Sequence, residues 1–166
     1  MADLRLEALS AANIVAANGL TLKRGQEQYA TPVSHAEAEQ TINPTTAWPR
    51  VVLEGDEVVG FIKGNLDPDE EREEFRCCVW SVNVKGSAQG HGVGRFAIHG
   101  LANEARSRGF DRLTVIWERG AQGPEEFFLH VGFTPIGETR YGEVLGAMPL
   151  SATDGQPATD GQPASA

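Results

Sequence analysis

Three glycines alternate with other residues in the segment Gln-Gly-His-Gly-Val-Gly-Arg, at residues 89–95. The segment follows an apolar run at residues 79–84 and precedes a long helical pattern. Glycine adopts unusual backbone angles at little cost and lets another molecule approach the main chain. At the start of a helix, such a loop directs unpaired N–H groups outward, where the helix dipole favours negative charge. The segment therefore predicts a cradle for a phosphate or pyrophosphate, with an ordinary helix-capping turn as the alternative.

The spacing of these glycines differs from that of the common nucleotide-binding loops. It is not Gly-x-Gly-x-x-Gly, and no Gly-Lys-Ser/Thr ends the segment as a Walker loop requires. It does match Gln/Arg-x-x-Gly-x-Gly/Ala at Gln89, Gly92 and Gly94. In this pattern the segment resembles the acetyl-CoA pyrophosphate loop of the GNAT acetyltransferase superfamily.

The elements expected after the loop resemble the same superfamily in their order. They are a helix ended by Gly109, a buried strand, and a short helix closed by Gly132-Phe133, at residues 96–108, 113–117 and 124–131. The resemblance covers roughly residues 80–150. It implies an α/β fold, with a mixed central sheet of about six or seven strands flanked by about four helices.

The rest of the chain predicts the elements that must hold the loop in place. Ser10 is expected to cap a short first helix. Ser34 is expected to open a second helix with Glu37 as its capping-box partner, and His35 is expected on the exposed surface of that helix. Alternating and apolar runs predict the remaining strands, at residues 4–9, 48–53, 58–65, 75–84, 133–139 and 143–150.

Length and composition indicate a single globular domain. A chain of 166 residues with 40% hydrophobic residues can bury a substantial core. No apolar run approaches the ~20 residues that span a bilayer, and the first residues lack the features of a signal peptide. Residues 1–150 are expected to form the GNAT acetyltransferase-like domain. Residues 151–166 carry a repeated Ala-Thr-Asp-Gly-Gln-Pro, whose turn-forming composition predicts a disordered tail.

Cysteine usage and net charge bear on the compartment and the partners. Cys77 and Cys78 are adjacent, so they point to opposite faces of a strand, and a disulfide between them would be strained. No Cys/His cluster has metal-ligand spacing, so a metal-free protein of the reducing cytoplasm is expected. The net charge of -9 argues against a nucleic-acid partner and suits a cationic acceptor, although acidic charge can serve solubility alone. No membrane partner is expected.

An acidic block precedes the strand expected at residues 75–84. Its carboxylates are Asp67, Asp69, Glu70, Glu71, Glu73 and Glu74. Such a block is usually a solvated surface, and attraction of a polycationic acceptor is the alternative.

The superfamily resemblance implies how acetyl-CoA would bind as the co-substrate. The backbone of Val82, Asn83 and Val84 would hydrogen-bond the pantetheine arm, in a gap beside the strand at residues 113–117. The loop would hold the pyrophosphate, and its candidate residues are Gln89, Gly90, His91, Gly92, Val93, Gly94 and Arg95. His91 stands where the superfamily often has Lys or Arg, so it brings less charge at neutral pH, and weaker binding is expected.

Acetyl transfer to an amine needs a polarised thioester, a neutral amine and a proton for the leaving thiolate. Where the superfamily often places a glutamate base, this chain has Cys78 and Ile116, so Glu118 is the catalytic candidate, with a solvated surface residue as the alternative. The tyrosine that commonly acts as the acid corresponds to Phe128. Either a water or the outgoing ammonium supplies this proton, or Tyr141 supplies it, or the protein does not catalyse transfer.

Three segments resemble, more loosely, the spermine/spermidine (diamine) branch of the superfamily, at residues 25–30, 48–50 and 137–143. They imply a polyamine-like acceptor, with Tyr29 and Trp80 as candidate substrate contacts. Aminoglycosides and protein N-termini are alternative acceptors, and a CoA-binding module without catalysis is the alternative function. Homodimers are common in the superfamily, so the resemblance allows one here.

Overall fold

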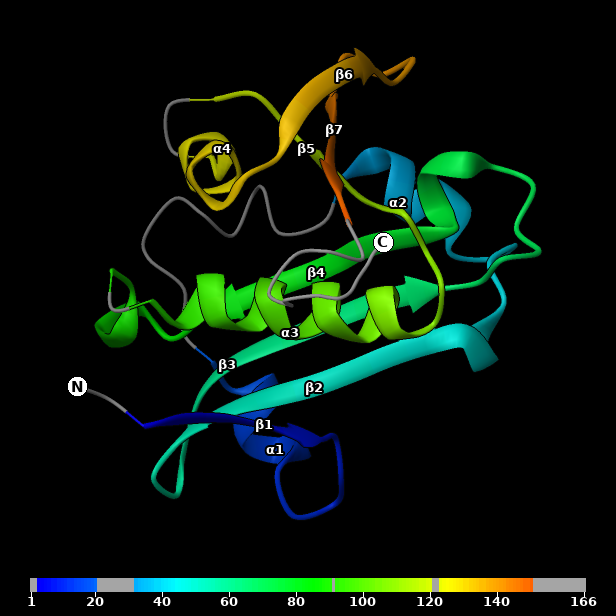
Figure 1. Cartoon of the computed structure of the whole chain (residues 1–166). Helices are drawn as coiled ribbons and strands as arrows, with labels where there is room; N and C mark the ends of the chain where they lie inside the picture. Colours follow the sequence, from blue (N-terminus) through cyan, green and yellow to red (C-terminus); the bar gives the residue numbers. More distant parts are fainter. Residues whose placement is uncertain (1–2, 21–31, 91, 121–122, 151–166) are drawn as a thin grey trace, which may run out of the picture.

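A seven-stranded mixed sheet forms the centre of the molecule, in the order β1-β2-β3-β4-β5-β7-β6 (Figure 1). The computed structural model describes residues 3–20, 32–90, 92–120 and 123–150. The strands are β1 (Leu4–Ala8), β2 (Ala47–Glu54), β3 (Glu57–Leu66), β4 (Cys77–Val84), β5 (Arg112–Trp117), β6 (Thr134–Glu138) and β7 (Val144–Pro149). The α-helices are α1 (Ile14–Asn18), α2 (Val33–Ala38), α3 (Val93–Ser107) and α4 (Glu125–Val131). The α/β architecture expected from the sequence is confirmed.

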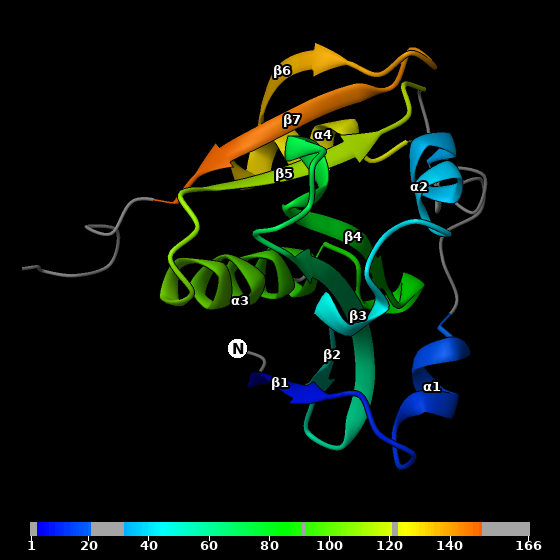
Figure 2. The same cartoon turned by 90° about the vertical axis from the view of Figure 1, so that its right-hand side faces the viewer.

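Helices cover both faces of the sheet. On one face, α3 and α4 share a buried cluster with the strands, which includes Leu101 of α3, Phe128 of α4 and Trp117 of β5. On the other face, Ala38 of α2 packs with Trp80 of β4 in a smaller cluster. Figure 2 shows α1 and α2 on the opposite side of the sheet from α3. None of the described helices is long and apolar enough to span a membrane.

The long helix α3 begins earlier than predicted and ends where predicted. It starts three residues before Phe96, so the end of the glycine loop forms its first turn. Its buried residues recur at helical spacing, at Val93, Ala97, Ile98, Leu101, Ala102 and Ala105. Beyond its end, Gly109 has φ 91° and donates its N–H to Arg106 (3.1 Å), while the Phe110 N–H donates to Ala105 (3.1 Å). These two bonds satisfy the last carbonyls of the helix in a Schellman motif.

The parallel pair formed by β4 and β5 is unusually short. The two strands are in register only at Cys78↔Thr114 and Val79↔Val115. On its other side, β4 pairs with β3 to the end, with a register shift that leaves Trp80 as an extra residue. Such a bulge bends the strand that carries it. Beyond Val79, β4 and β5 therefore diverge, and no strand of the described residues pairs with the β5-side edge of residues 80–84.

The two adjacent cysteines point to opposite faces of β4, as predicted. Cys77 belongs to the core cluster beneath α3, and Cys78 to the cluster beneath α2. Both are free thiols, and burial raises the pKa of Cys77 to about 12 and that of Cys78 as well. A thiol that stays protonated near neutral pH is a poor nucleophile, so both cysteines serve packing. The strand begins at Cys77 because residues 73–75 form a single 3-10 turn.

The predicted cap of the first helix is wrong. α1 begins at Ile14 rather than beside Ser10. The side-chain oxygen of Asn13 accepts the Ser10 N–H at 2.8 Å, and the Ile14 N–H donates to the Ser10 carbonyl at 2.9 Å. A polar turn closed by Asn13 therefore precedes the helix, and Ser10 opens that turn instead of the helix.

A buried carboxylate stands where the capping box of α2 was predicted. Ser34 lies inside the helix, and its hydroxyl donates to Glu143, which is 2% exposed and 109 residues away. The Val33 N–H (2.6 Å) and the Thr139 hydroxyl (2.9 Å) donate to the same carboxylate. Glu37 is therefore not the partner of Ser34. This set of bonds ties the β6–β7 hairpin to the start of α2.

His35 is buried, with 2% of its surface exposed, and the prediction that it lies on the surface is wrong. Its ring stacks on Trp80, with centroids 4.3 Å apart, and meets Phe75 edge-on at 5.9 Å. Its Nδ1 has no hydrogen-bond partner among the described residues. Burial lowers the pKa of His35 to about 4, although the charge of Glu143 and the backbone of Trp80 act in the opposite direction. The imidazole is therefore neutral at pH 7 and packs as an aromatic ring.

Replacing Glu143 with glutamine tests the buried carboxylate. An amide keeps one acceptor oxygen and turns an NH2 group toward the remaining donors, so the free energy of unfolding should fall by about 2 kcal/mol. Urea unfolding followed by circular dichroism measures the change. Glu39→Gln, at an exposed position after α2, is the control and should change stability by no more than ~0.5 kcal/mol. Equal stabilities of the two variants would contradict this role of Glu143.

The burial of His35 predicts a specific pH dependence. Its pKa is depressed in the folded state, so its stabilising contribution is complete above pH 6.5 and is lost as the pH falls toward 4. In that window the unfolded chain binds a proton that the folded chain does not. Between pH 7 and pH 4, the wild type should lose about 3 kcal/mol more stability than His35→Phe, which keeps a stacked ring without a titrating group. Parallel stability profiles of the two proteins would show that His35 does not titrate this way.

Candidate active site

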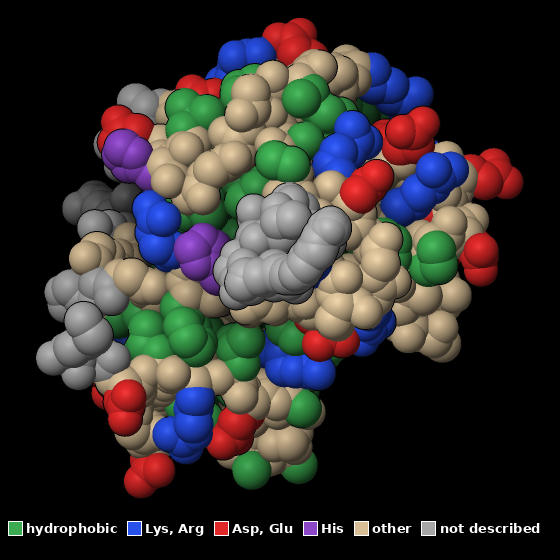
Figure 3. Space-filling model, in the orientation of Figure 1, with side chains coloured by type: hydrophobic (Ala, Val, Ile, Leu, Met, Phe, Trp, Pro, Cys, Tyr) green, Lys and Arg blue, Asp and Glu red, His purple; other side chains and the backbone are tan. Residues whose placement is uncertain are grey.

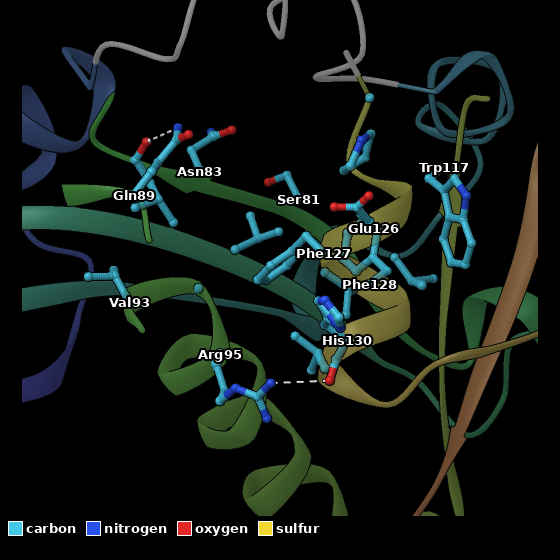
Figure 4. A pocket seen from close by; sticks show the side chains of 18 of the residues that line it. Ser81, Asn83, Gln89, Val93, Arg95, Trp117, Glu126, Phe127, Phe128 and His130 are labelled. Atoms are coloured by element: carbon cyan, nitrogen blue, oxygen red, sulfur yellow. Dashed lines mark hydrogen bonds between the residues drawn. The ribbon is translucent and has the colours of Figure 1, made fainter. Parts of the chain in front are cut away.

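A cavity of about 690 Å³ opens where β4 and β5 diverge (Figure 4). Its walls are the edge of β4, the end of β5, the first turn of α3, and α4. Every described residue that was predicted to bind the co-substrate lines this cavity: Val82, Asn83, Val84, Gln89, Gly90, Gly92, Val93, Gly94 and Arg95. His91 lies outside the described residues. The tertiary structure thus brings the strand and the loop together around one space.

The glycine loop forms one end of the cavity. Gly90 and Gly92 have φ angles of 86° and 84°, in the left-handed region that favours glycine, and no atom lies within 4 Å of a Cβ placed on either. Among the bonds between described residues, the first helical one at the start of α3 runs from the Phe96 N–H to the Gly92 carbonyl, at 2.9 Å. A helix leaves the N–H groups of its first turn without a carbonyl partner inside the helix, and in α3 these groups come before Phe96. An open loop in front of free helical amides fits a phosphate group.

Gly94 serves close packing rather than an unusual backbone angle. A Cβ on Gly94 would lie 2.7 Å from the ring of Phe127, so only glycine lets α4 approach the first turn of α3 this closely. A second contact joins the same elements, because the Arg95 guanidinium donates to the His130 carbonyl at 3.1 Å. The two walls of the cavity are therefore held together beside the loop.

The free edge of β4 forms the floor of the cavity. From Val79 to Val84 the strand extends for about 17 Å, at ~3.3 Å per residue. The Gln89 side chain donates to the Val84 carbonyl at 3.0 Å and joins the loop to the end of this edge. The backbone groups between these points have no strand on the β5 side, and buried backbone groups require a partner. An extended ligand arm rich in amides would provide one.

The inner end of the cavity is aromatic. Phe128 is 5% exposed, stacks on Trp117 with centroids 5.4 Å apart, and meets Phe133 edge-on at 5.7 Å. A phenylalanine at this position gains packing and supplies no hydroxyl. Tyr141, the alternative hydroxyl, is 44% exposed, donates to Glu37 at 2.6 Å, and is not among the residues that line the cavity.

Of the predicted catalytic and substrate-binding residues, one lines the cavity, one does not, and one is not described by the structure. Glu118 is half-buried just past the end of β5 and is not among the described residues that line the cavity. Trp80 lines the cavity and stacks on His35 from the opposite side of the sheet. Tyr29 lies outside the described residues.

Sequence reasoning missed three polar residues that line the cavity, Ser81, Glu126 and His130. Of these, Ser81 and Glu126 project into the space between β4 and α4 (Figure 4). Ser81 follows the bulge at Trp80, and a bulge between strands leaves no reliable trace in a sequence. Glu126 sits beside Glu125, and only the bond from the Trp117 indole to Glu125 (2.9 Å) tells which carboxylate faces inward.

The acidic block does not form a uniform anionic patch. Asp67 is buried, Glu70 pairs with Arg72 at 2.8 Å, and Glu73 lies 3.8 Å from Arg112. Acidic and basic side chains are interspersed over the face seen in Figure 3. Three of the six carboxylates in the block are therefore buried or lie beside an arginine, and they do not add to an exposed anionic patch.

Solved structures with the same fold are acetyltransferases of diverse acceptors. Ribosomal-protein-S18-alanine N-acetyltransferase from Escherichia coli is 16% identical, covers 90% of this chain and 95% of its own, and has a TM-score of 0.62. Nourseothricin acetyltransferase is 19% identical, with coverages of 89% and 99% and a TM-score of 0.65. Aminoglycoside 6'-N-acetyltransferase in complex with coenzyme A is 17% identical, with coverages of 93% and 99% and a TM-score of 0.62. A comparison with curated protein sequences finds no match.

The family itself is identified from the sequence, since the chain matches the acetyltransferase (GNAT) family over residues 20–133. This match spans more than half of the chain and contains both the glycine loop and the short helix α4. The open edge of β4, the loop at its end and the walls formed by α3 and α4 surround one cavity within the matched part of the chain. The protein belongs to the acetyltransferase (GNAT) family, a family of acyl-CoA-dependent N-acetyltransferases.

Proposed function

We propose that the protein acetylates a primary amine of a small, cationic, polyamine-like acceptor. The observation that carries the proposal is the free edge of β4, with the open glycine loop at one end and a cavity along its length. The looser resemblance to the diamine branch and the acidic net charge of -9 support a cationic acceptor. The similar structures act on an aminoglycoside and on a protein alanine, so these amines are the competing acceptor classes.

Different residues along the cavity bind different parts of the co-substrate. The amides at the start of α3 and the loop at Gly90 and Gly92 hold the diphosphate. The edge of β4 from Ser81 to Val84 holds the pantetheine arm by strand-like hydrogen bonds. Acetyl-CoA supplies an activated acetyl thioester when bound. The bulge at Trp80 turns the backbone at the far end of this edge, where N–H groups can polarise a carbonyl.

Proton transfer in this site relies on the solvent or on the amine. Phe128 has no hydroxyl to offer a leaving thiolate, and Tyr141 is engaged with Glu37. A general acid typically contributes ~10²–10⁴-fold, so we expect a slow enzyme rather than an inert one. Glu118 is retained as the proposed base through water, because it directly follows Trp117, which lines the cavity. The cytoplasm is the proposed compartment, and a homodimer is the proposed assembly.

A second candidate function follows from the packing of Phe128. A buried ring in the place of an acid suits a module that binds CoA without catalysis. In such a module the glycine loop and the β4 edge would be as well formed as they are here.

Valine in place of Gly92 tests the phosphate cradle. A β-branched side chain strains the left-handed backbone and fills the open space in front of the helical amides, so the Kd for coenzyme A should rise at least ~10-fold. Gly55→Val is the matched control, because Gly55 also has a positive φ (63°) with no atom near its Cβ but lies in the β2–β3 turn. Isothermal titration calorimetry gives the Kd of both variants. Their melting temperatures show how much stability each loses because valine adopts a positive φ. Equal losses of affinity in both variants would rule out a local role of Gly92.

An acceptor panel tests the proposed reaction. Release of free thiol from acetyl-CoA should be fastest with diamines and polyamines, slower with aminoglycosides and slowest with peptide N-termini. Coenzyme A binding without thiol release on any acceptor would favour the non-catalytic module. A preference for peptides or aminoglycosides would keep the family activity and replace the acceptor class.

A further inference from the structure

Ser81 carries the only hydroxyl among the described residues that line the cavity. It lies in β4, is half-buried, and projects into the space between β4 and α4 (Figure 4). Within the described part of the chain, its side chain takes part in no hydrogen bond. A hydroxyl both donates and accepts hydrogen bonds, so this one is available to a ligand in either role.

The bulge at Trp80 decides the direction of the Ser81 side chain. Val79 belongs to the core cluster beneath α3, and Val82 packs against the same cluster. In a regular strand, residues an odd number of positions apart point to opposite faces, so the bulge shifts the alternation by one position. Trp80 belongs to the cluster on the α2 face, and Ser81, which alternates with Val82, also faces away from α3. Two consecutive side chains of β4 thus leave the strand from the same face, beside the cavity.

The length of the co-substrate arm brings its sulfur to this bulge. The Gln89 side chain donates to the Val84 carbonyl, so the glycine loop proposed for the diphosphate starts beside Val84. A chain of about twelve bonds joins the phosphate ester of coenzyme A to its sulfur, and an extended backbone covers about four residues with that number of bonds. Counted back along β4 from Val84, this length ends at Trp80 and Ser81. The Ser81 hydroxyl therefore lies at the reacting end of the arm.

A leaving thiolate needs a hydrogen-bond donor in this part of the cavity. Burial disfavours the charged form of any group, so a thiolate without a donor leaves slowly. Phe128 has no hydroxyl to offer, and the Tyr141 hydroxyl donates to Glu37. The hydroxyl at the bulge is in place to take over that role from β4.

We infer that the Ser81 hydroxyl relays a proton from the reacting amine to the leaving sulfur. The inference rests on the proposed acetyl transfer. The C–N bond forms and the C–S bond breaks, and the electron pair of the C–S bond passes to sulfur. The Ser81 O–H proton moves to this sulfur, while Oγ accepts a proton from the cationic nitrogen of the attacking amine. Ser81 ends the step as it began, and the amine supplies the proton that the thiol gains.

The thiol of bound coenzyme A provides a test that does not depend on turnover. We would titrate the complex with base and follow the ultraviolet absorbance of the thiolate. Ser81→Ala should raise the pKa of the bound thiol by about 1, because a hydrogen bond to the charged sulfur is lost. Ser81→Thr keeps the hydroxyl and should restore most of the difference. Ser107→Ala is the matched control and should change nothing, because it removes an exposed hydroxyl at the end of α3 that donates to the Glu104 carbonyl.

Turnover of acetyl-CoA with 1,4-diaminobutane gives the second readout. Ser81→Ala should lower kcat by ~10²-fold and leave the KM for acetyl-CoA nearly unchanged, because the relay acts only in the transition state. Ser81→Thr should recover most of kcat, and Ser107→Ala should match the wild type. A residue that served only packing would change the melting temperature without this division between kcat and KM.

Three results would overturn the inference. The first is an equal pKa of the bound thiol in the wild type and in Ser81→Ala. The second is a weaker affinity for coenzyme A in Ser81→Ala with an unchanged kcat, which would assign Ser81 to binding of the arm. The third is a loss of kcat in Glu126→Gln but not in Ser81→Ala, which would route the proton through the carboxylate on α4. If the wild type acetylates no amine, the proposed function is refuted, and the pKa of the bound thiol still decides whether Ser81 contacts the sulfur.

Discussion

The parallel pairing between β4 and β5 ends after two residue pairs, and the cavity exists because of this early end. In a continuous parallel sheet each strand would satisfy the backbone groups of its neighbour, and no ligand could enter. Here the bulge at Trp80 bends β4 away, while β5 continues beside β7 as far as Trp117. The exposed edge carries donors and acceptors at strand spacing. A ligand with an extended arm of amides can complete the sheet at this point.

The helices on one face keep this opening in shape. α3 places its first turn at the outer end of the β4 edge, and α4 closes the opposite wall. Three contacts hold α4 in place: Phe127 against Gly94, Arg95 with the His130 carbonyl, and Glu125 with the Trp117 indole. Phe128 adds a stacked aromatic pair to this wall. The site thus gains rigidity at the position where the superfamily commonly has a hydroxyl.

On the other face of the sheet, α2 supports the inner end of the cavity through ring stacking and buried hydrogen bonds. His35 is kept neutral by burial and stacks on Trp80, which also lines the cavity. Glu143 gathers hydrogen bonds from α2 and from the β6–β7 turn, and so fixes α2 against the sheet. Burying a carboxylate requires such donors, because an unpaired charge in the interior is costly. The wall beside Trp80 is therefore built from groups that are distant in the chain.

Local patterns were sufficient for much of the fold. The glycine loop, the end of α3 at Gly109, the β2–β3 hairpin and the opposed faces of the two cysteines follow from backbone preferences and hydrophobic periodicity over a few residues. The residues expected to bind the co-substrate are contiguous segments of strand and loop, and their described members line one cavity, while their role stays a prediction.

What the sequence determined by itself is the order of its elements, the position of the glycine loop before α3, and the family. Only the tertiary structure decided which polar groups meet. The partner of Ser34 is Glu143 rather than Glu37, and His35 is covered by Trp80, because contacts across the sheet outweigh capping preferences within one turn. Of two adjacent carboxylates, Glu125 accepts a bond from Trp117 and Glu126 lines the cavity. Such choices depend on distances between segments far apart in the chain, and local sequence patterns carry no information about them.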